Sequence, residues 1–259
     1  MRTERFSLAV WLMPLLPIAL ACWLYFGNLQ TSSFLVINHA TQKLPDLLWA
    51  GLTFLGNGWG IFAVAFPLLL LAPRLLSAGI LAGMISAIAS STLKPLFDLP
   101  RPAGVLTDGS FYRIGDALLY KAFPSGHTLT AFAIATALYF SLDKNKRLSL
   151  LPVFIIASLV GLSRIAVGAH WLTDVLAGAG VGLWCGLLGA SIAQAIPGHQ
   201  LLPNKLGPRI VALGGLVAIY ILLTQNLDLD LNQIFQYLGA AVIAITLAFF
   251  IKAQTHQTT

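Results

Sequence analysis

Charge is what this sequence lacks most. Only 9% of its 259 residues are Asp, Glu, Lys or Arg, whereas 58% are hydrophobic. A soluble domain carries about 25% charged residues, so this composition excludes an ordinary water-soluble globular protein. The mean hydropathy of +0.84 favours a polytopic membrane protein of the all-α class instead. Such a protein crosses the bilayer with helices of about 20 apolar residues.

Cysteine is almost absent as well. The two cysteines, Cys22 and Cys185, both fall in apolar segments. There we expect them to pack as small hydrophobic residues rather than to form a disulfide or a metal site. No group of Cys, His or carboxylate residues has the spacing of a metal site, so the sequence predicts no metal and no other cofactor. The basic residues lie in loops, where membrane topology explains them, so no nucleic-acid partner is predicted.

Long uncharged runs predict eight membrane-spanning helices. The segment Thr31–Trp49 is apolar but interrupted by polar residues, and we interpret it as an interfacial or packed loop helix. The predicted fold is a polytopic membrane helical bundle with a six-helix core over 1–196 and two C-terminal transmembrane helices over 197–259. The predicted spans are Leu8–Phe26, Leu52–Ala72, Leu75–Lys94, His127–Leu142, Leu148–Ser163, Trp171–Ile196, Ile210–Thr224 and Ile234–Ile251.

The N-terminal segment allows two interpretations. Arg2 and Arg5 precede an apolar run that ends in Ala19-Leu20-Ala21, as in a cleaved signal peptide. The run is long for a signal peptide, which favours a retained membrane anchor.

The positions of Lys and Arg predict the orientation. If the N terminus is cytoplasmic, nine of the 15 basic residues fall on the cytoplasmic side, and three of the other six belong to the polar motifs described below. The hypothesis is that both ends are cytoplasmic and that the motifs face the periplasm or the cell exterior. The nine are Arg2, Arg5, Arg74, Lys144, Lys146, Arg147, Lys205, Arg209 and Lys252.

Small and aromatic residues suggest how the helices pack. Gly178 and Gly182 belong to a row of small residues in the span Trp171–Ile196, and we expect them to let helix backbones approach closely. Three tryptophans lie near the predicted outer interface, where we expect anchoring side chains. They are Trp49, Trp59 and Trp171.

Three short polar motifs stand out in this apolar chain. Charged groups at the ends of apolar stretches are costly near a bilayer unless they face one another or water, so the motifs indicate one functional site. Three fixed cations, Lys94, Arg101 and Arg164, suit a phosphate or a similar oxyanion. The motifs are Lys94-x6-Arg101-Pro102, Pro124-Ser125-Gly126-His127 and Ser163-Arg164-x5-His170-x3-Asp174.

The two histidines suggest phosphoryl transfer. His170 and Asp174 are four residues apart, so they share one face of a helix that begins there. His170 would attack phosphorus while Asp174 accepts its other ring N–H. His127 follows Ser125-Gly126 at a helix start, where free backbone N–H groups bind anions, and it would protonate the leaving group. Each motif taken alone also has a structural interpretation. His170 and Asp174 fit a buried hydrogen bond, Pro124-Ser125-Gly126 fits a turn and helix cap, and the Lys and Arg side chains could extend to lipid headgroups at helix ends.

Together the motifs resemble the signature of the type 2 phosphatidic acid phosphatase superfamily, K-x6-R-P, P-S-G-H and S-R-x5-H-x3-D. The resemblance covers roughly Leu75 to Ile196, and no motif position departs from it. It implies catalytic His170, His127 and Asp174, with a phosphohistidine intermediate. It also implies a phosphate site that consists of Lys94, Arg101, Ser125, Gly126, Arg164 and Ser163.

The resulting hypothesis is a metal-independent hydrolase of phosphoric esters or diphosphates in a bacterial inner membrane. Its first expected substrate is undecaprenyl diphosphate, followed by phosphatidylglycerol phosphate and phosphatidic acid. The alternatives are a lipid A phosphatase, a phosphotransferase from polyprenyl diphosphate to lipid A, and a transporter. Charges grouped on one side of the membrane disfavour the transporter. The expected partners are the lipid phosphate and the bilayer, and the sequence indicates no oligomeric state.

Overall fold

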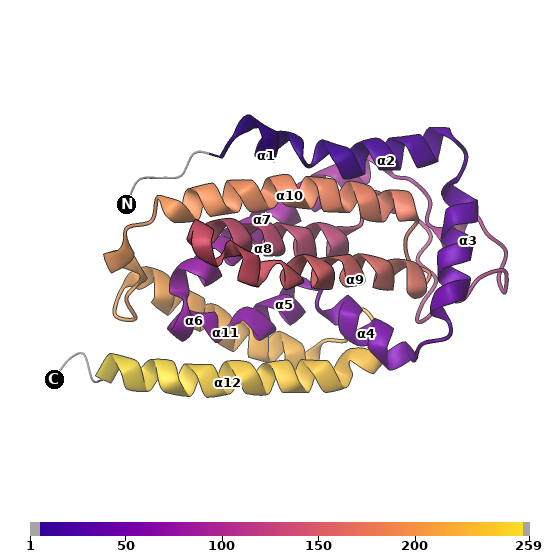
Figure 1. The fold of residues 1–259 in the computed structure, drawn as a ribbon. Helices are drawn as coiled ribbons and strands as arrows, with labels where there is room; N and C mark the ends of the chain where they lie inside the picture. The colour runs from indigo at the N-terminus through magenta and orange to yellow at the C-terminus, as the bar shows by residue number, and fades with distance from the viewer. Residues whose placement is uncertain (1–5, 256–259) are drawn as a thin grey trace.

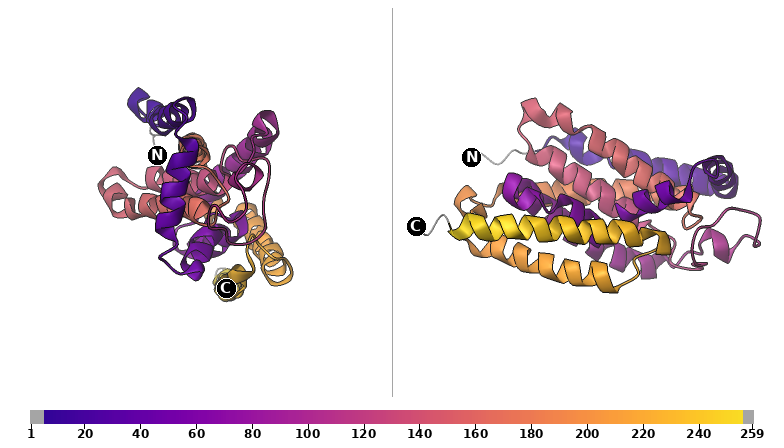
Figure 2. Two further views of the ribbon diagram at one scale, coloured as in Figure 1. Left: turned by 90° about the vertical axis from the view of Figure 1, so that its right-hand side faces the viewer. Right: turned by 90° about the horizontal axis from the view of Figure 1, so that it is seen from below.

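The computed structural model describes residues 6–255, which form an elongated bundle of helices (Figures 1 and 2). Most long helices run along the length of the bundle, whereas α3 lies across one end. The α-helices are α1 (Leu8–Leu12), α2 (Leu15–Phe26), α3 (Gln30–Thr41), α4 (Asp46–Phe54), α5 (Gly58–Ala65), α6 (Leu68–Leu71), α7 (Pro73–Phe97), α8 (Gly126–Ser141), α9 (Pro152–Ala166), α10 (Leu172–Gln194), α11 (Leu206–Thr224) and α12 (Gln233–Thr255). The 3-10 helices are η1 (Pro102–Gly104), η2 (Lys144–Leu150), η3 (Gly198–Leu201) and η4 (Asp230–Asn232).

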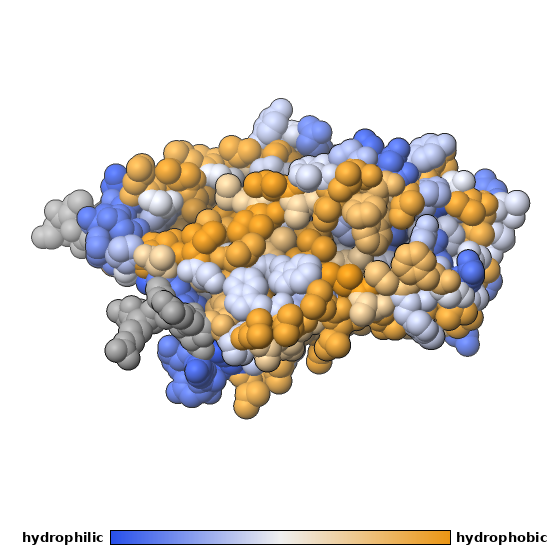
Figure 3. All heavy atoms as spheres, turned by 90° about the horizontal axis from the view of Figure 1, so that it is seen from above, coloured by the Kyte–Doolittle hydropathy of each residue, from blue (hydrophilic) through white to orange (hydrophobic). Residues whose placement is uncertain are grey.

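The helices confirm a polytopic membrane bundle. Within residues 6–255, six helical stretches are long and apolar enough to cross a membrane, or up to seven if the bent pair α4–α5 counts as one span. The helix α8 has 16 residues and packs among α7, α9 and α10. Figure 3 shows hydrophobic residues over the middle of one face and hydrophilic residues gathered toward its ends. This distribution is the one that a bilayer requires.

The predicted single span Leu52–Ala72 is wrong, because the chain breaks it into three helices. The axes of α4 and α5 differ by 78°. Asn57 lies at the break, where its side chain accepts a hydrogen bond from the backbone N–H of Trp59 at 2.9 Å and caps α5. Pro67 separates α5 from α6, since proline cannot donate the backbone hydrogen bond that a continuous helix needs.

The helix α3 is the packed loop helix that the polar residues of 31–49 predicted. Asn38 is fully buried, and its Nδ2 donates to the carbonyls of Tyr112 and Ile165, both at 2.9 Å. Its Oδ1 accepts from the backbone N–H of Tyr112 at 2.8 Å. One side chain therefore holds α3 against the long α7–α8 loop and against the end of α9.

The helices α8 and α10 pack with their backbones in close contact, as the small residues predicted. A Cβ atom added at Gly178 would lie 2.7 Å from the carbonyl oxygen of Ser125, and one at Gly182 would lie 2.5 Å from that of Leu129. Such distances leave no space for a larger residue. The starts of α8 and α10 are thereby fixed relative to each other.

Two of the three tryptophans are not interface anchors. Trp49 and Trp171 are buried, with only 3% and 2% of their surfaces exposed. The ring centroid of Trp171 lies 5.2 Å from that of Phe34, and its Nε1 donates to the carbonyl of Pro100 at 2.9 Å. The prediction failed because the ends of the helices are covered by α3 and the α7–α8 loop, so aromatic residues near those ends fill a core.

The first and last helices frame this core. Trp184 in α10 donates to the carbonyl of Trp11 at 2.9 Å, which holds the α1–α2 segment along the bundle. That this segment is a retained anchor and not a cleaved signal peptide stays a prediction.

At the other end of the chain, α11 and α12 pack against each other and against α5 and α6. Phe66, Leu222 and Ile243 are buried in the core that these helices share.

The described chain begins and ends at one end of the bundle, and the α7–α8 loop lies at the other end (Figure 1). We expect a cysteine introduced at Ser110, in that loop, to react with a membrane-impermeant thiol reagent in intact cells, since the loop should face outward. A cysteine at Asn145, in η2, is the matched control and should react only after lysis. The reverse labelling would place the loop in the cytoplasm.

Candidate active site

The three motifs converge at the end of the bundle that carries α3 and the α7–α8 loop. Lys94 lies in the last turn of α7, His127 in the first turn of α8 and Arg164 near the end of α9. Asp174 lies in the first turn of α10, and its carbonyl accepts from the backbone N–H of Ser125 at 3.0 Å. This hydrogen bond joins the second motif directly to the third.

His170 is held through both ring nitrogens. Its Nδ1 lies 3.2 Å from Asp174 Oδ2, and its Nε2 lies 3.3 Å from Arg101 Nη1. Because a guanidinium can only donate, the lone pair must be on Nε2 and the proton on Nδ1. Asp174 Oδ2 also accepts from the backbone N–H of Trp171 at 2.9 Å, which fixes the carboxylate. The arrangement leaves the lone pair of Nε2 on the side of Arg101, where an anion attracted by that cation would lie.

The surroundings of His170 keep it neutral. Only 2% of the residue is exposed, and burial lowers its pKa well below the ordinary value of 6.5. The nearby cations Arg101, Arg164 and Lys94 lower this pKa further. A neutral imidazole keeps the unprotonated nitrogen that attack on phosphorus requires.

Arg101 is fixed by backbone carbonyls rather than by a carboxylate. Its Nε donates to Tyr120 at 2.8 Å, and its Nη1 donates to Ala169 at 3.1 Å. Its Nη2 donates to the carbonyl of Lys121 at 3.4 Å. The positive charge is therefore not neutralised by these contacts and stays available to an anion.

Arg164 keeps a free donor in a buried position. The residue is 4% exposed, and its Nη1 donates to Thr53 Oγ1 at 3.1 Å. Its Nε has no hydrogen-bond partner among the described residues. Buried donors of this kind are normally paired, so an anion would satisfy it. Ser163 is connected to this arginine through Thr53. Its Oγ donates to the carbonyl of Val160 and lies 3.0 Å from Thr53 Oγ1.

The start of α8 provides neutral donors beside Lys94. A Cβ atom added at Gly126 would lie 3.6 Å from Lys94 Nζ, so the ammonium group is next to the first turn of α8. Ser125 is fully buried and its Oγ accepts from Thr128 Oγ1 at 3.0 Å, which leaves the hydroxyl hydrogen of Ser125 free to donate. The positive end of the helix dipole adds to the attraction for an anion.

The structure adds three residues that the motifs did not reveal. His127 Nε2 lies 3.1 Å from Asp228 Oδ2, and Asn57 Nδ2 donates to the same oxygen at 2.7 Å. Thr53 contacts Arg164, as described above. The only sequence signal for these contacts was the pair of aspartates, Asp228 and Asp230, in the loop between the last two predicted spans. Within residues 6–255 no group of three or more His, Cys, Asp or Glu could hold a metal ion.

The fold and the site define a polytopic membrane protein with a buried, neutral histidine among fixed cations. The sequence model of the PAP2 superfamily matches residues 72–197. The crystal structure of Aquifex aeolicus LpxE is 32% identical, with a TM-score of 0.53 over 62% of this chain and 94% of that one. The chain belongs to the PAP2 superfamily, as its three motifs predicted.

Two curated relatives match shorter segments. The lipid A 1-phosphatase of Porphyromonas gingivalis is 40% identical over 81 residues, which are 31% of this chain and 18% of that protein. The phosphatidylglycerophosphatase B of Bacillus subtilis is 39% identical over 69 residues, which are 24% of this chain and 34% of that protein. The matched segments thus cover well under two thirds of either relative.

The protonation of His170 can be measured directly. In protein labelled with ¹³C at histidine and held in detergent, we expect the His170 resonance to titrate with a midpoint below pH 6.5, because burial and the cations disfavour the charged ring. The His170→Ala variant identifies the resonance. Because His170 is neutral above its pKa, the enzyme should keep its activity until the pH falls through this lowered pKa and the ring becomes protonated. A midpoint at or above 6.5 contradicts the proposed environment.

Proposed function

We propose that this protein is an integral membrane lipid phosphatase that hydrolyses a phosphomonoester or diphosphate of a membrane lipid. The observation that carries the proposal is the neutral Nε2 of His170, positioned by Asp174 and surrounded by Lys94, Arg101 and Arg164. A nucleophile among fixed cations suits an anionic phosphorus centre. The placement of this site beside membrane spans suits a substrate that lies in the bilayer.

In the first step the Nε2 lone pair of His170 attacks phosphorus. The P–N bond forms as the P–O bond to the leaving group breaks, and protonated His127 gives that oxygen its proton. Asp174 stabilises the positive ring of the resulting phosphohistidine through Nδ1–H.

In the second step water attacks the phosphohistidine. A proton of the water passes to His127, the new P–O bond forms and the P–N bond breaks. Both histidines regain their starting states, and one water has been consumed for each phosphate released. During both steps the cations bind the equatorial phosphoryl oxygens, where negative charge accumulates.

An apolar groove beside the site supports a lipid substrate. It encloses about 750 Å³, which is within the size range of ligand pockets, and its walls come from α5, α6, α7, α8 and α11. Gly126 and Ser90 line it at the end near Lys94, so the groove begins at the proposed phosphate position. Gly83, Met84 and Ile134 continue it along the bundle. A hydrocarbon tail in this groove would keep its phosphate next to His170.

The relatives help to choose lipids to test. Proteins similar to this chain are named a lipid A 1-phosphatase and a phosphatidylglycerophosphatase. Lipid A and phosphatidylglycerol phosphate therefore join undecaprenyl diphosphate, the substrate that we place first because it combines a diphosphate with a single long tail. We propose that the site faces the outer side of a bacterial inner membrane, because the basic loops favour that orientation.

Purified protein in detergent should release inorganic phosphate from at least one of these lipids. We expect the activity to survive EDTA and to be inhibited by vanadate, because the three cations can bind a five-coordinate oxyanion. His170→Ala should lower kcat by several orders of magnitude. Phosphate release that is unchanged in this variant would refute the mechanism. Phosphate that appears on lipid A instead of in solution would identify a phosphotransferase.

The groove is tested by filling it. A Cβ atom at Gly83 would meet only Ile134, at 3.9 Å, so the groove has space for a larger side chain there and Gly83→Phe should fold. We expect this variant to raise KM for a long-chain lipid phosphate by roughly tenfold, which corresponds to about 1.4 kcal/mol. KM for a short, water-soluble phosphate ester should not change. The control is Ile88→Phe on the same helix, at a position that is 66% exposed. Equal effects of the two variants would exclude the groove as the tail site.

A further inference from the structure

We propose that Asp228 is a positioning residue for His127, so that the C-terminal pair α11–α12 completes the active site. Its carboxylate would orient the imidazole and stabilise the protonated form that gives up the proton. The inference rests on the proposed phosphatase function and assigns a role to helices that carry no family motif.

The geometry is that of a held carboxylate. Asp228 Oδ2 is within hydrogen-bond distance of His127 Nε2, at 3.1 Å, and of Asn57 Nδ2, at 2.7 Å. Only 21% of the Asp228 side-chain surface and 19% of that of His127 are exposed, so the pair is largely screened from water. The backbone of Asp228 has φ of +64°, an uncommon conformation for a residue other than glycine. The α11–α12 turn therefore adopts an unfavourable backbone at the residue that reaches His127.

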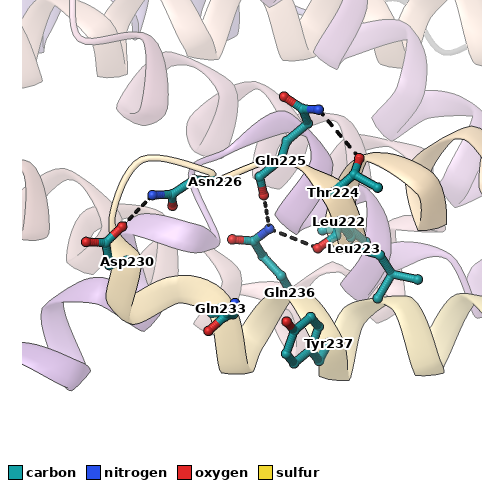
Figure 4. Close-up of a pocket in the computed structure, with 9 residues that line it drawn as sticks. All are labelled: Leu222, Leu223, Thr224, Gln225, Asn226, Asp230, Gln233, Gln236 and Tyr237. Carbon is teal, nitrogen blue, oxygen red and sulfur yellow. Dashed lines mark hydrogen bonds between the residues drawn. The ribbon is translucent and has the colours of Figure 1, made fainter.

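The turn that carries Asp228 is anchored by hydrogen bonds on one side and by apolar contacts on the other. Figure 4 shows the hydrogen bonds of Gln236 on the first side. Gln236 is 3% exposed, and its Nε2 donates to the carbonyls of Leu222 and Gln225 at 2.9 and 2.6 Å. On the other side, Leu229 is buried in a cluster that includes Trp49. The position of the carboxylate is thus set by the folded turn and not by a mobile side chain alone.

The hydrogen bond decides which nitrogen of His127 can reach the substrate. An ionised Asp228 can only accept, so Nε2 must carry a proton and Nδ1 is left for the leaving oxygen. The orientation is the reverse of His170, where Nδ1 meets Asp174 and Nε2 faces phosphorus. In this arrangement His127 donates from Nδ1 only when both nitrogens are protonated. The first step therefore needs a cationic His127.

The groups around His127 make a carboxylate necessary. Arg164 from α9, Lys94 from α7 and His170 from the α9–α10 loop all face the ring, and a positive charge on any of them disfavours a second one there. Asp228 offsets these charges from the α11–α12 turn. Burial by itself would raise the pKa of Asp228, but His127, Arg164 and the Asn57 amide together lower it below the ordinary range. Asp228 is therefore ionised throughout the working pH range.

The test is Asp228→Asn, which keeps a hydrogen-bond acceptor and removes the charge. We expect kcat on a lipid phosphate to fall by about 10²-fold, in line with the loss of acid catalysis. The loss should be much smaller on p-nitrophenyl phosphate, whose leaving group needs little protonation. The pH above which kcat falls should also move down, because a cationic His127 is then lost at lower pH. Asp228→Glu, which keeps the charge, should retain the wild-type pH profile with a smaller loss of kcat.

Asp230→Asn is the matched control. Asp230 lies on the same turn, where it accepts a hydrogen bond from Asn226, and among the described residues His127 is hydrogen-bonded to Asp228 and not to Asp230. The kcat and pH profile of Asp230→Asn should therefore match those of the wild type. If the wild type releases no phosphate from any lipid, the proposed function fails. If the wild type is active and Asp228→Asn keeps its kcat and pH profile, only this inference fails. A loss that is equal for both substrates, with an unchanged pH profile, would show a purely structural role and would also overturn it.

Discussion

The close approach of α8 and α10 is the constraint on which the rest of the site depends. His127 begins one of these helices, while His170 and Asp174 lie at the start of the other. Gly178 and Gly182 remove the side chains that would separate the two backbones. The spacing of His127 and His170 is therefore set by main-chain packing, which is stiffer than contact between long side chains.

The charges explain why the site lies at an end of the bundle. Three cations and a neutral histidine would be costly in the middle of a bilayer, but at the helix ends they can use backbone carbonyls. Arg101 does so with three carbonyls that the α7–α8 loop and the residue before His170 provide. Since these partners are uncharged, they position the guanidinium without neutralising it. Binding of a phosphate would then supply the missing negative charge.

Much of this could be predicted from the sequence, because local patterns determine it. Uncharged runs gave the long helices, and fixed spacing gave the residues of the three motifs. The break at Asn57 was missed because an apolar run does not show where a helix bends, although glycines flank that position. Asp228 was missed because a contact between residues 101 positions apart depends on tertiary packing. The burial of Trp171 was missed for the same reason, since only the folded chain shows what covers it.

The C-terminal pair α11–α12 lies outside the segment that the family model matches. The family match ends at residue 197, whereas the carboxylate on His127 comes from residue 228. His170 precedes α10 and Asp174 lies in its first turn, so these two residues meet without help from any other segment. His127 instead meets Asp228, which lies in the turn of a separate helical pair that packs on α5 and α6. In the proposed mechanism, phosphate binding and attack by His170 therefore use residues of the matched segment, while the protonation of His127 depends on the turn between α11 and α12.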